Sequence, residues 1–201
     1  QFEKNGKNLE RKLNPDRSYI SRDGKGLKPQ SPYAKIKLIE EKLLNNNKKK
    51  MKYISLRFGT IAGVSKGMRF HTAINKFCLS ASLNQKVKVY KTAINQYRPY
   101  LSLKDAFKLF KFCIIKNVFD NGTYNIHSGN YTVSQIIKMI KKYKKNVKIK
   151  FINTKIMNRL SYHLDNKKIK SLGLTLNSSI RKDIKETLGL FKNLVNKWGV
   201  K

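Results

Sequence analysis

Two side chains near the beginning of the sequence, Tyr33 and Lys37, have types and a spacing that suit proton transfer. They stand four residues apart at the start of a segment with helical periodicity, so both would lie on one face of a helix. A free phenol has a pKa of about 10 and is a weak base at neutral pH, but a neighbouring ammonium favours the phenolate. Tyr33 could then take a proton from a substrate hydroxyl. In a chain so rich in lysine, a chance pair on a surface helix is the competing interpretation.

The elements that would position this pair follow from apolar periodicity. The sequence predicts a helix over residues 33–45 and a buried strand over 53–58 that ends at Gly59, whereas polar residues 1–30 predict loop. We expect Thr132 to cap a helix and Gly173 to end another. Further helices are predicted at 69–83, 104–116, 132–143, 166–172 and after Ser178 or Ser179, and further strands at 87–90, 123–126 and 147–152. The alternation predicts an α/β fold with a mostly parallel sheet.

Four motifs occur in an order that resembles one enzyme family. Residues 29–38 read Pro-Gln-Ser-Pro-Tyr-Ala-Lys-Ile-Lys-Leu and resemble the active-site helix Pro-x-Ser-Pro-Tyr-x-x-x-Lys-Leu of extended short-chain dehydrogenase/reductases, the nucleotide-sugar epimerase/dehydratase family. Residues 56–63 resemble the family's Leu-Arg-x-x-Asn-x-x-Gly, and residues 96–106 resemble Gln-x-Arg-Asp-Phe-x-x-Val-x-Asp-Val. Residues 122–129 resemble Gly-x-x-Tyr-Asn-Ile-Gly-Ser-Gly, which precedes a capped helix.

The resemblance implies a redox reaction on a nucleotide-sugar, with NAD or NADP as cofactor. Tyr33 would be the catalytic acid/base, while the adjacent carbon of the sugar gives hydride to the cofactor. Lys37 would lower the pKa of Tyr33 and bond the nicotinamide ribose. The resemblance implies that Tyr33 would bind the cofactor as well. The resemblance does not decide between epimerase, dehydratase and reductase.

The resemblance also implies substrate-binding residues. Arg98 would grip the diphosphate of the substrate, where a guanidinium fork fits two oxygens, although a loop salt bridge would explain it as well. Asp105 is expected to cap its helix or hold a loop. Weaker substrate-binding candidates, for which a solvated helix face is the alternative, are Thr60, Arg69, His71 and Asn75.

Several departures from the family pattern matter. Thr60 stands where the family has Asn, and Pro99 stands where it has an acidic residue. The family's catalytic Ser or Thr has no clear counterpart, since Ser18 and Ser21 are too close to Tyr33. No Gly-x-x-Gly-x-x-Gly run occurs in the 201 residues; Gly-x-Gly at 24–26 lacks a preceding strand, so the cofactor diphosphate has no cradle.

The expected architecture is therefore the C-terminal part of a Rossmann-type parallel sheet plus a small α/β substrate-binding domain, with the N-terminal Gly-rich half absent. Residues 1–67 would end the dinucleotide-binding domain, and residues 68–201 would form mainly the substrate-binding domain with interleaved Rossmann elements. Such a portion is expected to be inactive alone and could form a homodimer when full length. A non-catalytic remnant or subunit that binds a nucleotide-sugar is the second interpretation.

The net charge of +34 raises a third interpretation, a basic nucleic-acid-binding protein. Of the 45 basic residues, 37 are Lys and only 8 are Arg, and Asn and Ile occur 20 and 19 times. Lys, Asn and Ile have A/T-rich codons, so compositional drift explains the charge without a partner. Arg, which phosphate and base recognition favours, is scarce. We expect no specific nucleic-acid binding, only weak binding that collapses with salt.

Other site types have little support in the sequence. Cys78 and Cys113 lie in apolar helical patterns that predict buried free thiols, and no Cys/His spacing indicates a metal site. No apolar run approaches the ~18 residues that a membrane span needs. We expect a cytoplasmic protein without a membrane or metal partner.

Overall fold

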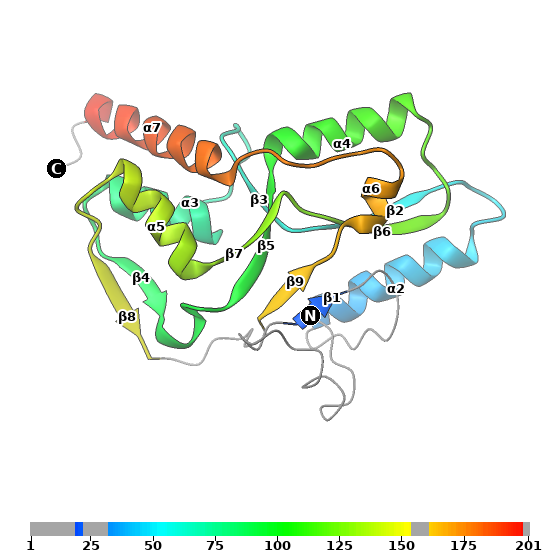
Figure 1. Ribbon diagram of the computed structural model, residues 1–201, viewed down its shortest axis with the longest axis horizontal. Coiled ribbons are helices and arrows are strands. Elements are labelled where there is room, and N and C mark those ends of the chain that lie inside the picture. Colours follow the sequence, from blue (N-terminus) through cyan, green and yellow to red (C-terminus); the bar gives the residue numbers. More distant parts are fainter. Residues whose placement is uncertain (1–18, 22–31, 154–160, 199–201) are drawn as a thin grey trace.

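The computed structural model describes residues 19–21, 32–153 and 161–198. Helices and strands alternate, as the sequence predicts (Figure 1). The helices are α2 (Pro32–Asn46), α3 (Ala73–Ser82), the 3-10 helix η2 (Lys91–Ala93), α4 (Leu103–Ile115), α5 (Val133–Tyr143), α6 (Lys167–Ser171) and α7 (Ile180–Trp198). The strands are β1 (Tyr19–Ser21), β2 (Ile54–Phe58), β3 (Thr60–Ala62), β4 (Val87–Tyr90), β5 (Tyr97–Ser102), β6 (Gly122–Ile126), β7 (Gly129–Thr132), β8 (Ile149–Ile152) and β9 (Tyr162–Leu164).

Most strand pairs are parallel, which confirms the expected sheet type. β2 pairs with β6, β3 with β5, β4 with β8 and β1 with β9 in parallel, and β5 with β7 is antiparallel. β2 and β3 form one extended stretch that changes partner at Gly59, whose N–H donates to the Ile126 carbonyl at 2.8 Å. A Cβ at position 59 would lie 3.0 Å from the Pro99 carbonyl, so this crossing favours glycine.

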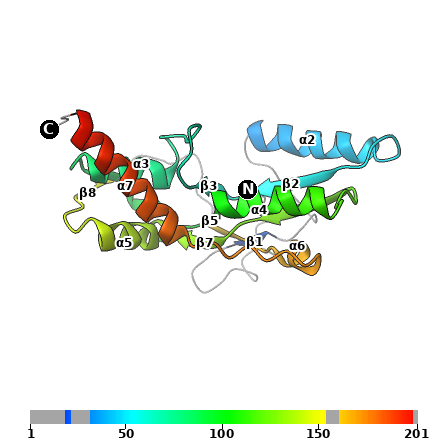
Figure 2. The same cartoon turned by 90° about the horizontal axis from the view of Figure 1, so that it is seen from above.

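Two apolar clusters hold the fold together. The first joins α3, α5 and α7 around Ile74, Ile136 and Ile184, each almost fully buried. The second packs α4 and α6 on β6 around Leu109, Ile126 and Ile169. In both Figure 1 and Figure 2, the three helices of the first cluster lie at one end of the molecule and α2 lies at the other.

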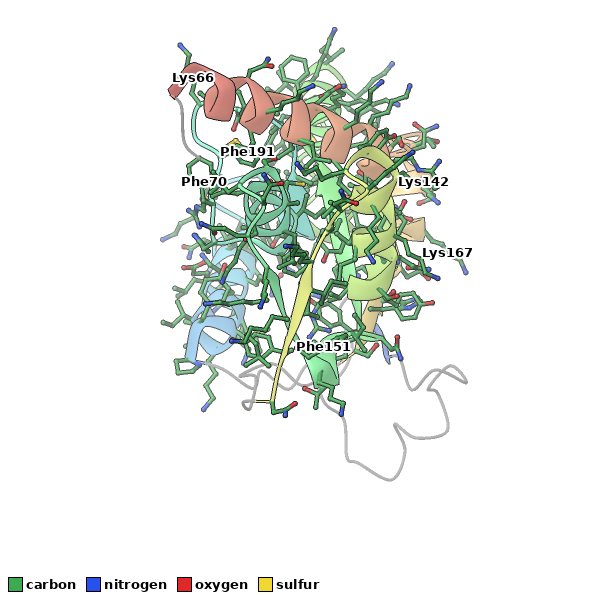
Figure 3. The ribbon with its side chains drawn as sticks, turned by 90° about the vertical axis from the view of Figure 1, so that its left-hand side faces the viewer. Lys66, Phe70, Lys142, Phe151, Lys167 and Phe191 are labelled. Carbon is green, nitrogen blue, oxygen red and sulfur yellow. The ribbon has the colours of Figure 1, made fainter. Side chains whose placement is uncertain are left out.

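Side chains at the α3–α7 end show how the surface is built. Phe70, in the turn before α3, packs against Phe191 of α7 with ring centroids 5.8 Å apart (Figure 3). Lys66, Lys142 and Lys167 stand on three different segments in this view, and exposed lysines occur on nearly every described element. The charge is therefore spread over the described surface.

Local signals account for several helix ends. Thr132 caps α5 through a capping box, in which its hydroxyl accepts from Gln135 N–H and the Gln135 side chain accepts from Thr132 N–H. Gly173 follows α6 with φ of 89°, and Ser179 accepts from the first N–H groups of α7. Each of these positions agrees with the sequence.

Some predicted elements were wrong. Residues 19–21 form strand β1 beside β9 and are not loop, because a partner distant in sequence supplies the pairing. The helix expected over 69–83 begins at Ala73, because Thr72 Oγ donates to the Arg69 carbonyl in a preceding turn. The sequence did not predict β3, β5, β7 or β9. The motif residues 29–31, Ser18 and the Gly-x-Gly at 24–26 lie outside the described residues.

Within the described ranges, no helix is both long enough and apolar enough to cross a membrane. The same ranges contain no group of three or more His, Cys, Asp or Glu side chains arranged to hold a metal ion. Cys78 and Cys113 are buried free thiols, as expected.

Candidate active site

A groove of about 510 Å³ lies between α2 and the strands β2, β6 and β9. Tyr33 and Lys37 line it from α2, and Tyr162 lines it from β9. Leu56 and Asn125, on the adjacent strands β2 and β6, form part of its wall. The groove thus combines an apolar wall with a few polar groups, as small-molecule sites commonly do.

The helical spacing places Tyr33 and Lys37 together, as the sequence predicts. Pro32 occupies the first position of α2, where its fixed φ suits helix initiation. The Lys37 ammonium lies 5.8 Å from the centroid of the Tyr33 ring. Tyr33 is 71% exposed, so its hydroxyl is accessible to a substrate. The two side chains therefore lie within cation–π distance of each other on one face of α2.

Lys37 also contacts a carboxylate. Its Nζ donates to Glu40 Oε2 at 2.7 Å, and both side chains are about half exposed. This hydrogen bond and the charge of Glu40 raise the pKa of Lys37, so the ammonium keeps its proton at neutral pH.

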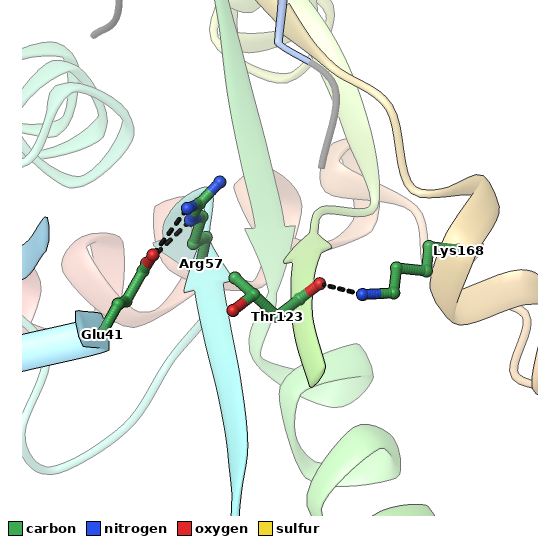
Figure 4. Close-up of polar contacts among 4 residues, drawn as sticks. All are labelled: Glu41, Arg57, Thr123 and Lys168. Atoms are coloured by element: carbon green, nitrogen blue, oxygen red, sulfur yellow. Dashed lines mark hydrogen bonds and ion pairs between the residues drawn. The ribbon is translucent and has the colours of Figure 1, made fainter. Parts of the chain in front are cut away.

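A second ion pair fixes α2 on the sheet. Arg57 of β2 donates from Nε and Nη2 to the two carboxylate oxygens of Glu41, at 2.8 and 2.6 Å (Figure 4). Both side chains are mostly buried, at 14% and 20% exposure. Because Glu41 is eight residues after Tyr33, it lies on the same helix face as Tyr33 and Lys37. The Arg57–Glu41 pair therefore directs that face toward the groove.

Arg98 of β5 lies beside the groove through Tyr162. Its guanidinium carbon is 5.4 Å from the centroid of the Tyr162 ring, and Tyr162 lines the groove. Arg98 Nη1 donates to the Tyr97 carbonyl at 2.8 Å, and Nη2 donates to Gln96 Oε1 at 2.9 Å. Burial lowers the pKa of Arg98 from its ordinary value, but a guanidinium stays charged at neutral pH. The Arg98 guanidinium is therefore held in contact with Tyr162, a residue of the groove wall.

Comparison with known proteins decides the family. The model of the NAD dependent epimerase/dehydratase family matches residues 10–126. The chain belongs to this family. The match includes Tyr33, Lys37 and Arg98, and it confirms the resemblance that the four motifs indicate. No curated protein matches the sequence.

Solved structures of epimerases and dehydratases share the fold. A UDP-glucuronic acid 4-epimerase from Bacillus cereus, in complex with UDP-glucuronic acid and NAD, has a TM-score of 0.76 and 17% identity over 90% of this chain and 60% of its own. A dTDP-glucose 4,6-dehydratase from Bacillus anthracis, in complex with NAD, has a TM-score of 0.71 and 20% identity over 92% of this chain and 60% of its own. RMD from Pseudomonas aeruginosa, complexed with NADPH, has a TM-score of 0.70 and 15% identity, covering 84% of this chain and 58% of its own.

These likenesses confirm the Rossmann-type α/β fold class. The chain spans about three fifths of the length of the structures it matches. Its own residues fit one end of a dinucleotide. Tyr33 and Lys37 present a hydroxyl and an ammonium to an open groove, which suits a ribose, whereas the 201 residues contain no Gly-rich loop for a diphosphate.

The weaker substrate candidates of this family member stand apart from the groove. Thr60 is exposed on β3, opposite Tyr100 of β5. Arg69 and His71 are exposed in the turn before α3. Asn75 is buried, and its Nδ2 donates to the Arg69 carbonyl at 3.0 Å. Among the contacts of the described residues, none joins these four side chains to Tyr33 or Lys37. Asn75 shapes the turn that carries Arg69 and His71.

Asp105 holds a loop, as the sequence indicates. It is buried and accepts hydrogen bonds from Ser128 Oγ at 2.5 Å and from Ser178 N and Oγ at 2.9 and 2.7 Å. The sequence reasoning missed Glu40 and Glu41. The available signal was their position three and four residues after Lys37, where helical geometry brings side chains together.

Proposed function

We propose that the chain is the C-terminal portion of an NAD(P)-dependent nucleotide-sugar epimerase, dehydratase or reductase. The observation that supports this most directly is the Tyr33–Lys37 pair on one face of α2, at the wall of a groove, in a member of the epimerase/dehydratase family. Structural neighbours hold NAD or NADPH, and several hold nucleotide-sugars. A cytoplasmic location is the ordinary setting for such chemistry and remains part of the proposal.

In this mechanism Tyr33 takes a proton from a sugar hydroxyl, and Lys37 makes the phenol a stronger acid by favouring its phenolate. The nicotinamide cofactor, when bound, accepts hydride from the carbon that carries the hydroxyl. Tyr33 and Lys37 would hold its ribose. Arg98 would bind the substrate's diphosphate, because its guanidinium is held beside Tyr162 and presents planar N–H donors. Weaker roles in substrate binding are assigned to Thr60, Arg69, His71 and Asn75.

The proposal requires a cofactor-binding half. Within the described residues β2 pairs with β6 on one side only. Beside it, α2 exposes Ile36, Ile39 and Leu43, each more than half accessible. We assign this surface to the Gly-rich half of the dinucleotide-binding domain, to which residues 1–67 would belong. Residues 68–201 would form mainly the substrate-binding domain. The assembled enzyme could be a homodimer.

The test is steady-state kinetics on the chain joined to a Gly-rich half of the same family. Tyr33→Phe should weaken cofactor binding less than Lys37→Met does, and reduce turnover by about 10²–10⁴-fold, because it removes the hydroxyl that moves the proton. Lys37→Met should weaken cofactor binding and move the pH midpoint of turnover upward. Tyr143→Phe, which alters an exposed tyrosine of α5, is the matched control and should behave as the parent.

The same assay separates the proposed enzyme from a non-catalytic subunit that binds a nucleotide-sugar. Arg98→Ala should weaken nucleotide-sugar binding, measured by calorimetry, far more than it changes the circular dichroism spectrum. Binding that depends on Arg98, together with turnover that does not depend on Tyr33, would favour the non-catalytic subunit. Near-parental turnover in Tyr33→Phe would refute the catalytic role of the pair.

A further inference from the structure

Two adjacent carboxylates on α2 have different partners. Glu41 is bound at both oxygens by Arg57 and is mostly buried. Glu40 contacts Lys37 and is about half exposed. Both line the groove. Only Glu41 is needed to explain how α2 is attached to the sheet, so the role of Glu40 is a separate question.

The position of Lys37 gives Glu40 a chemical consequence. Tyr33 lies one helical turn before Lys37, and Glu40 lies about one turn after it. The flexible lysine stem can extend toward either neighbour. In this structure the ammonium donates to Glu40 Oε2 at 2.7 Å and at the same time lies over the Tyr33 ring, 5.8 Å from its centroid. A carboxylate on the far side of Lys37 therefore competes with the phenol for the same cation.

We propose that Glu40 is a positioning residue that draws Lys37 away from Tyr33 and thereby sets the acid strength of the phenol. The inference rests on the proposed function of the Tyr33–Lys37 pair. While Lys37 is held by Glu40, Tyr33 receives less stabilisation of its phenolate.

The other charged and titratable groups around the groove do not replace Glu40 in this role. Glu41 is neutralised by Arg57, which reaches α2 from β2. Tyr162 approaches from β9 as a partly buried phenol, and this burial raises its pKa, so it carries no charge at neutral pH. Asn125, on β6, is uncharged. The described wall leaves Glu40 as the carboxylate that contacts Lys37.

The test measures the titration of Tyr33 in the 201-residue chain by itself, without cofactor or substrate. Tyrosine ring Cζ carbons are labelled with ¹³C, and the Tyr33 resonance is assigned by its loss in Tyr33→Phe. Glu40→Gln should lower the titration midpoint of Tyr33 by about 0.2–0.7 pH unit, the range expected for an exposed ion pair. In a Lys37→Met background the same substitution should give a clearly smaller shift, because Glu40 then has no cation to withdraw.

Glu186→Gln is the matched control. Glu186 is a similarly exposed carboxylate that contacts Lys104 at 2.6 Å on a different helix pair, so its loss should leave the Tyr33 midpoint unchanged. An unchanged midpoint in Glu40→Gln, or an equal shift with and without Lys37, would overturn the proposal. These outcomes are independent of turnover, so a failure here is distinct from a failure of the Tyr33→Phe kinetics.

Discussion

The helices α2 and α5 both carry apolar side chains at helical spacing, less sharply segregated in α2, and their environments in the structure are opposite. In α5, Ile136 and Ile140 are 0% and 1% exposed. In α2, Ile36 and Ile39 are both 55% exposed, and no residue of the helix is buried. Periodicity therefore predicts that a helix forms and which face is apolar. Whether that face is covered depends on elements elsewhere in the fold.

The two helices are also held by different forces. α5 packs with α3 and α7 in one apolar cluster and begins with a capping box. α2 is attached through the Arg57–Glu41 pair and the turn that leads to β2, and none of its residues is buried. Burial of an aliphatic side chain contributes about 1.5–3 kcal/mol, whereas the Coulomb attraction within a mostly buried ion pair is largely offset by the desolvation of its two charges. We therefore expect α2 to be the less stable of the two helices in the isolated chain.

The largest expected difference is between two isoleucines. Ile136→Ala on α5 should reduce the free energy of unfolding by about 2–5 kcal/mol, because it leaves a cavity in a closed core. Ile39→Ala on α2 should change it by less than about 0.5 kcal/mol, as for most exposed positions. Urea denaturation followed by circular dichroism measures both. Equal losses of unfolding free energy would show that the apolar face of α2 is packed in solution, and that the two helices do not differ in this way.

The comparison becomes sharper when the chain is joined to a Gly-rich half. If that half covers α2, as proposed, Ile39→Ala should then become clearly destabilising, while the effect of Ile136→Ala should stay the same. If the effect of Ile39→Ala remains small in the joined protein, the Gly-rich half does not cover this face of α2.

A smaller difference is expected between the two carboxylates that hold helices in place. Asp105→Ala removes three hydrogen bonds that join α4 to Ser128 and Ser178, and should reduce the free energy of unfolding by about 2–3 kcal/mol. Glu41→Gln keeps an oxygen acceptor but leaves the mostly buried Arg57 guanidinium without its counter-charge, and should reduce it by about 1.5–3 kcal/mol. Urea denaturation gives the global values.

Hydrogen exchange distinguishes the two cases further. Glu41→Gln should speed amide exchange in α2 without changing it in α5, because it releases one local attachment. Asp105→Ala should speed exchange in both α4 and α7. Uniform acceleration in Glu41→Gln would mean that α2 unfolds together with the rest of the chain.

Local signals account for what the sequence predicted correctly. Apolar spacing located α2 and α5, and the Thr132–Gln135 box and Gly173 located helix ends, because these signals act within a few residues. The motif residues Tyr33 and Lys37 fell on one helix face for the same reason. The missed features depend on distant partners. β5 contains Pro99 and is only recognisable from its pairing with β3 and β7, and Arg57 meets Glu41 across 16 residues.

The smallest expected effect concerns a buried carboxylate of α7, in the well-packed region. No residue of α2 is buried in this way. Asp183, in the first turn of α7, is buried, and its Oδ2 has no hydrogen-bond partner among the described residues. Burial raises its pKa above the ordinary value of an aspartate, and Glu186 and Asp105 act in the same direction, while Ser102 and Lys104 oppose them. Tight packing therefore makes the Asp183 carboxyl group harder to ionise than a solvated aspartate.

The sign of the pH dependence follows from that raised pKa. Below the pKa of an unfolded aspartate, Asp183 is protonated in both states and causes no difference. As the pH rises through the folded-state pKa, the unfolded chain has already ionised, and the folded state loses stability relative to it. Asp183→Asn cannot ionise, so its stability relative to the parent should increase between about pH 4 and pH 7. Urea unfolding of both chains at several pH values measures this difference, and Glu40→Gln, which alters a half-exposed carboxylate of α2, should show little of it. A difference that stays constant over this range would mean that Asp183 is solvated, and that the region around α7 is more open than its packing indicates.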